Sequence, residues 1–173
     1  MATPEQVTST QEVRFCRSAD GTGIAYAVHG SGPPLVLDAC WLSHLQFDWQ
    51  SPVWRHYLVE LGRLATVIRF DERGHGLSDR DTTDFSLDRR IQDLEAVVDH
   101  AGLDRFALLT MAQGGPVAIS YADRHPDRLT LGLRTVERHL HNSYGTLGVQ
   151  GSAARTAAVA RLLAAGSPRP TRT

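Results

Sequence analysis

The sequence lacks lysine, is poor in cysteine and has no long apolar run. All 18 basic residues among its 173 are arginine, which we attribute to the base composition of the coding DNA rather than to function. The two cysteines, Cys16 and Cys40, are too few for a disulfide framework and have no metal-ligand spacing. Both lie in apolar, strand-like segments, so we expect small buried side chains there. We therefore predict that the protein carries neither a metal nor a cofactor.

Signals for membranes and export are also missing. The sequence contains no run of 18 apolar residues that could cross a bilayer. The first ten residues have neither the basic nor the apolar region of a secretory signal. These absences predict a cytoplasmic protein that does not associate with membranes.

The near-neutral net charge hides a division along the chain. The formal net charge is -1, with an isoelectric point near 6.7. Residues 1–129 contain 12 arginines and 18 acidic residues, a net charge of -6. Residues 130–173 contain six arginines and a single acid, Glu137, a net charge of +5. An asymmetry of this size indicates two units with different partners.

The apolar pattern predicts a sheet covered by helices. The first two strands flank a glycine-bearing loop and form a hairpin. The later strands are continuously apolar and alternate with helices, which is typical of a mostly parallel sheet buried on both faces. Strands are expected at 13–18, 24–29, 34–40, 66–70 and 106–109, and helices at 53–64, 86–101 and 116–124.

The most informative segment is a strand, a tight turn and a helix at residues 108–118. It has the layout of a nucleophile elbow, Gly-x-Ser-x-Gly, which holds a serine hydroxyl on a strained turn above a sheet. Ala112 occupies the nucleophile position, and its methyl group cannot attack a carbonyl. Thr110 stands at the first glycine of the motif, whereas Gly114 retains the second.

With these motifs, residues 13–129 resemble the α/β-hydrolase family. The resemblance extends to Asp71–Asp79 after a buried strand and to Tyr121–Leu129 after the elbow helix. The family's triad follows the order Ser, acid, His, and both partners would follow a sixth strand that we do not find. The resemblance therefore implies an inactive enzyme without catalytic residues, retaining an oxyanion hole from the backbone N–H groups of Gln113 and Trp41.

Two further residue sets in this part allow more than one interpretation. His75 and Asp71 could form an acid–base pair, but their loop is expected to shape the end of the sheet. An aromatic set could line a ligand pocket or belong to the core, and the sequence does not decide between these. That set comprises Trp41, Phe47, Trp49 and Trp54. The segment Trp41–Trp49 also resembles the hydrolase subgroup that is fused to bacterial signalling and transcription-factor modules.

The basic segment predicts an amphipathic helix with polar side chains opposite its apolar face. The residues that match a known pattern are Arg134–Val136, His139–Leu140, Asn142, Tyr144 and Leu147–Val149. Through them the segment resembles the recognition helix of LuxR-type helix-turn-helix regulators, although the preceding scaffold helices are missing. The alternative is an ordinary packing helix. The resemblance implies DNA-binding roles for Arg134, Thr135, Glu137, Arg138, His141 and Asn142.

The sequence therefore predicts a shortened regulator with two parts. These are a truncated α/β-hydrolase-like sensor at 13–129 and a partial all-α helix-turn-helix segment at 130–165, with residues 1–12 and 166–173 disordered. The expected function is transcription regulation, with DNA and a small-molecule ligand as partners. The alternatives are an ester or amide hydrolase, a small-molecule binder, or a degenerate product without function. An unpaired apolar strand at 105–110 would also favour homo-oligomers through the sheet edge.

Overall fold

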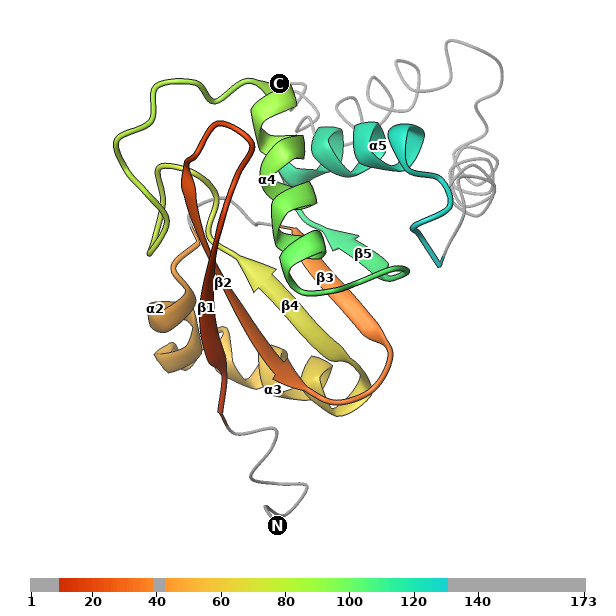
Figure 1. Cartoon of the computed structure of the whole chain (residues 1–173). Helices are drawn as coiled ribbons and strands as arrows, with labels where there is room; N and C mark the ends of the chain where they lie inside the picture. The colour runs from red at the N-terminus through yellow and green to blue at the C-terminus, as the bar shows by residue number, and fades with distance from the viewer. Residues whose placement is uncertain (1–9, 39–42, 131–173) are drawn as a thin grey trace, which may run out of the picture. The chain divides into compact units, whose positions relative to one another are not determined.

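The computed structural model describes residues 10–38 and 43–130 (Figure 1). They belong to a compact unit that ends at Thr130. Five strands form one sheet in the order β1-β2-β4-β3-β5. The elements are β1 (Glu12–Arg17), β2 (Gly23–Gly30), β3 (Pro34–Asp38), α2 (Leu45–Gln50), α3 (Arg55–Leu64), β4 (Thr66–Phe70), α4 (Leu87–His100), β5 (Ala107–Thr110) and α5 (Gly114–Arg124).

Helices pack on both faces of the sheet because successive strand residues point to opposite sides. Val36 on β3 belongs to a core cluster that contains Ile91 and Leu94 of α4 and Val117 of α5. Its neighbour Leu37 belongs to a second cluster, built with α2 and α3. Figure 1 shows α4 and α5 on one side of the strands and α3 on the other. The fold is therefore a three-layer α/β arrangement.

The sheet is mixed: the predicted N-terminal hairpin is present, and so is parallel pairing among β3, β4 and β5, but β2 also pairs antiparallel with β4. β3 pairs in parallel with β4 and with β5. β2, however, pairs antiparallel with both β1 and β4. Residues 24–27 of β2 are fully buried, which produces a continuous apolar run although the neighbours are antiparallel. The apolar pattern reports burial on both faces and carries no information about strand direction.

Two helices begin two residues away from the predicted positions, and one helix was not predicted. α3 begins at Arg55 and α5 at Gly114, rather than at residues 53 and 116. The short helix α2, of 6 residues, was not predicted. Its two buried residues, Leu45 and Trp49, are only one turn apart, and a single turn gives no periodic signal.

Among the described residues β5 is the edge strand of the sheet, as expected, but the residue before it, Phe106, is paired. The Phe106 N–H donates to the Arg128 carbonyl oxygen at 3.0 Å, and the Thr130 N–H donates to the Phe106 carbonyl oxygen at 3.0 Å. These bonds form a parallel bridge between Phe106 and Leu129. The chain leaving α5 thus returns to the edge of β5 within the described residues.

Candidate functional site

The turn between β5 and α5 has a strained backbone at Ala112. Its φ is +51°, and it is the only non-glycine residue with positive φ among residues 10–38 and 43–130. This conformation costs an L-residue about 1–2 kcal/mol, so the surrounding structure must maintain it. The Gly114 N–H donates to the Met111 carbonyl oxygen at 3.1 Å and closes the turn. Ala112 is exposed, and its methyl group stands on the outer side of this turn.

Side chains from two other segments bind Gln113, the residue after Ala112. The Gln113 side-chain amide donates to Glu72 Oε2 at 3.0 Å. Arg90, on α4, forms an ion pair with the same carboxylate. Its Nη2 also lies 3.5 Å from the Gln113 carbonyl oxygen. Three segments that are distant in sequence thus meet beside the turn.

Sequence reasoning did not identify Glu72 and Arg90. Glu72 belongs to the quoted loop motif at residues 71–79, but nothing in its spacing relates it to residue 113. It is 18 residues from Arg90 and 41 residues from Gln113. An acid in the loop motif and an arginine in the following helix were the only signals available in the sequence.

Asp71 and His75 do not form an acid–base pair. The Asp71 carboxylate is fully buried and accepts N–H bonds from Leu45, at 3.1 Å to Oδ1, and from Leu77, at 2.8 Å to Oδ2. His75 Nδ1 lies 3.1 Å from the Arg73 carbonyl oxygen instead. A Cβ at Gly76 would lie 2.0 Å from Asp71 Oδ2, so the loop requires glycine there. These contacts support a structural role for the loop rather than an acid–base pair.

A buried guanidinium fixes the same loop to α4. Arg73 is fully buried and donates from Nε and Nη2 to the Asp93 carboxylate, at 2.8 and 2.7 Å. Its Nη1 reaches Asp20 Oδ2, in the hairpin loop, at 2.9 Å. The bonds to Asp93 raise the pKa of Arg73, and the bond from Arg73 lowers the pKa of Asp20. This network orients the loop that carries Glu72.

The three residues of the aromatic set that the structure describes differ in their burial. Trp49 is buried against the ring of His29, with ring centroids 4.8 Å apart. Phe47 is 67% exposed and Trp54 is 39% exposed. Trp41, which was also predicted to donate to the oxyanion hole, lies outside the described residues.

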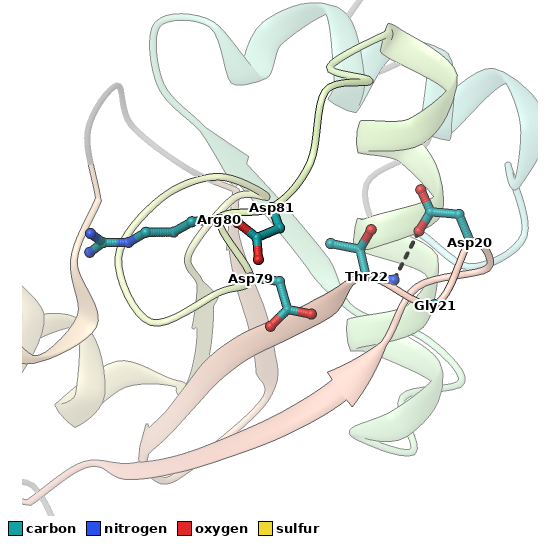
Figure 2. Close-up of a pocket in the computed structure, with 6 residues that line it drawn as sticks. All are labelled: Asp20, Gly21, Thr22, Asp79, Arg80 and Asp81. Atoms are coloured by element: carbon teal, nitrogen blue, oxygen red, sulfur yellow. Dashed lines mark hydrogen bonds between the residues drawn. The ribbon is translucent and has the colours of Figure 1, made fainter.

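A pocket of about 370 Å³ adjoins the hairpin loop (Figure 2). Its acidic side chains already bind backbone groups: Asp20 Oδ1 accepts the Thr22 N–H at 3.1 Å, and Asp79 Oδ2 accepts the Gly23 N–H at 2.7 Å. Figure 2 shows the Arg80 side chain pointing away from the other lining residues. Residues 10–38 and 43–130 contain no group of His, Cys, Asp and Glu side chains that could hold a metal ion.

Comparison with known proteins identifies the family. A model of the α/β hydrolase fold matches residues 34–130, the segment from β3 to the end of the described residues. The chain belongs to the α/β hydrolase fold family. The turn at Ala112 has the strand–turn–helix layout and the positive φ that we expected of a nucleophile elbow, and we call it the elbow below.

Several relatives in the α/β hydrolase family are enzymes. The chain is 34% identical over 111 residues to a non-heme haloperoxidase from Rhodococcus erythropolis, covering 64% of this chain and 39% of that protein. It is 30% identical over 128 residues to haloalkane dehalogenase 2 of Mycobacterium bovis, covering 73% and 42%. The crystal structure of an esterase from Rhodococcus sp. ECU1013 matches with a TM-score of 0.59 and 31% identity, covering 68% of this chain and 42% of that one. The chain thus spans about two fifths of the length of the relatives it matches.

These matches overturn the predicted DNA-binding regulator. The relatives are hydrolase-fold enzymes named for small-molecule reactions, and nothing found indicates a LuxR-type segment or DNA as a partner. The prediction was wrong because it relied on short matches in a basic helix-like segment. The six residues predicted to bind DNA, at positions 134–142, lie outside the described residues. No helix in the described part of the chain is long and apolar enough to cross a membrane.

Proposed function

We propose that the α/β-hydrolase unit binds a small neutral organic molecule at the elbow without forming a covalent intermediate. The relatives are named for esters or halogenated compounds, which supports a ligand of that size and polarity. One observation carries the proposal. The backbone of Ala112 has the positive φ expected of the strained turn in a nucleophile elbow, but its side chain has no nucleophilic atom.

The elbow offers binding groups that do not depend on a nucleophile. Helix α5 begins at Gly114, so its amino-terminal end and partial positive charge lie at the turn. The backbone N–H of Gln113 is the group that the motif assigns to an oxyanion hole. A carbonyl or similar acceptor would receive this N–H, while the exposed Ala112 methyl group leaves room for the rest of the ligand.

Binding can be tested without turnover by saturation-transfer NMR on the full chain. The probe is N-phenylacetamide, a neutral amide with one carbonyl acceptor, at about 1 mM, where a weak complex is detectable. Transfer to its acetyl and ring protons is expected, and Ala112→Leu should abolish it by filling the space above the turn. Asp123→Leu, which adds the same side chain near the end of α5, is the matched control and should leave transfer unchanged. Equal transfer in the Ala112→Leu variant would refute binding at the elbow.

The second candidate is hydrolysis, which the enzymatic relatives favour. It would require a nucleophile other than residue 112, because alanine supplies none. Release of p-nitrophenol from p-nitrophenyl acetate, measured against a buffer blank, distinguishes the two candidates. A saturable, protein-dependent rate would favour the hydrolase, whereas binding without turnover favours the proposed function.

A further inference from the structure

The Gln113 side chain is directed away from the helix that its residue caps. Gln113 is the N-cap of α5, yet no side-chain bond caps that helix. N-cap side chains ordinarily accept the free N–H groups of the first turn. The Gln113 amide instead donates to Glu72 Oε2 at 3.0 Å, so its orientation is set by a different segment.

We infer that Glu72 and Arg90 are positioning residues that hold Gln113, and through it the left-handed turn at Ala112. This inference deepens the proposed function, because the Gln113 N–H is the group assigned there to the ligand. The two side chains are distant in sequence from the elbow but contact both ends of residue 113. Glu72 binds its side chain, and Arg90 Nη2 lies 3.5 Å from its carbonyl oxygen.

Burial makes this arrangement specific. The side chains of Glu72 and Arg90 are 10% and 18% exposed, and buried charges are stable only when paired and hydrogen-bonded. Each therefore depends on the other and on Gln113 for its partners. Arg90 Nε is buried without a partner among the described residues. The observed contacts of the Arg90 guanidinium with Glu72 and with the Gln113 carbonyl oxygen are the ones that bear on its position.

The network also explains how an alanine remains at φ +51°. The conformation is unfavourable for any residue with a Cβ, so neighbouring contacts must compensate. Gln113 is tied to the loop after β4 and to α4, while the Gly114 N–H bonds back to Met111. Releasing Gln113 would let the 112–113 peptide rotate and turn its N–H away from the ligand position.

The test is an NMR measurement of backbone conformation at the elbow, made on the full isotope-labelled chain without a ligand. The readouts are the ¹³Cβ shift of Ala112, which reports its φ, and the amide shift of Gln113. Gln113→Leu removes the tether while retaining the backbone N–H, and should move the Ala112 ¹³Cβ shift away from left-handed values. The double exchange Glu72→Gln with Gln113→Glu reverses the donor and the acceptor of the bond between residues 72 and 113 and conserves the net charge. It should restore the left-handed ¹³Cβ shift of Ala112. Glu60→Gln, which breaks the exposed Arg63–Glu60 pair, is the control and should change neither shift.

An unchanged Ala112 shift in a folded Gln113→Leu variant would overturn the inference, as would a double exchange that fails to restore it. If Gln113→Leu does not fold, Arg90→Met removes the contact to the Gln113 carbonyl oxygen instead, and the same two shifts are measured. A purely structural role would lower the unfolding temperature without moving the two shifts selectively. If the Ala112 shift responds as expected but N-phenylacetamide does not bind, the result counts against the proposed function and not against the positioning role of Glu72 and Arg90. The two proposals can therefore fail separately.

Discussion

The ring of His29 on β2 donates from Nε2 to the Leu58 carbonyl oxygen on α3, across 2.9 Å. This bond connects two elements 29 residues apart and fixes the neutral tautomer with the proton on Nε2. His29 is 3% exposed, and Nδ1 has no partner among the described residues. Burial accordingly lowers the pKa of His29 below its usual value.

This lowered pKa predicts that stability falls in mild acid. As the pH falls through about 6.5, His29 is protonated more readily in the unfolded chain than in the folded chain, where its pKa is lower. The unfolded state then binds more protons, so the free energy of unfolding decreases as pH falls, by at most about 1.4 kcal/mol per pH unit for this group. Urea unfolding at pH 7.5 and pH 5.5 measures the loss. His29→Gln should reduce the pH dependence, whereas the exposed His56→Gln should not; equal slopes in both variants would contradict the prediction.

Gly30 requires glycine because of a close backbone approach. Its φ is +77°, and a Cβ there would lie 2.4 Å from the Gly62 carbonyl oxygen. Gly30→Ala should lower the free energy of unfolding by about 3 kcal/mol or more, since overpacking is added to backbone strain. The matched control is Gly21→Ala, which has φ +88° and no atom within 4 Å. It should lose only the strain, about 1 kcal/mol, in the same chemical denaturation experiment. Similar losses at both sites would show that the contact to Gly62 is unimportant.

Removing Arg73 should strongly destabilise the fold. Arg73→Met leaves Asp93, which is 1% exposed, as a buried carboxylate without its guanidinium partner. Breaking a buried pair in this way costs about 3–5 kcal/mol. Adding Asp93→Asn should recover part of the loss, because the uncompensated charge is then gone. Arg63→Gln, which breaks an exposed pair, should change stability by less than about 1 kcal/mol. A small loss for Arg73→Met in thermal unfolding would disprove this account of the network.

Restoring a hydroxyl at the elbow should not create an esterase. Ala112→Ser supplies a nucleophile, but an unassisted serine is weak without a general base. His75, the histidine of the loop motif, contacts the Arg73 carbonyl oxygen instead. Any gain in p-nitrophenyl acetate hydrolysis should stay below about 100-fold, the lower end of what a positioned base contributes. A larger gain would mean that a base already lies within reach of residue 112.

Several features could be predicted from the sequence because they depend on local patterns. The hairpin around 19–23, the strand at 66–70 and the helix beginning after Ser86 all match the structure closely. The turn at Ala112 was also predicted, since a buried strand followed by small residues and a helix determines the elbow's backbone. That residue 112 is an alanine rather than a serine is readable at a single position.

The tertiary structure alone decided how distant segments meet. The antiparallel pairing of β2 with β4 could not be predicted, because a strand buried on both faces has the same apolar pattern in either direction. The contacts that hold Gln113 join residues 41 apart, and no local periodicity encodes such a pair. The absence of lysine, cysteine pairs and long apolar runs excluded several classes of protein. The tertiary structure alone brings Glu72, in the loop after β4, and Arg90, on α4, into contact with Gln113 beside Ala112. Such contacts depend on how distant segments pack, because buried charges require paired and hydrogen-bonded partners.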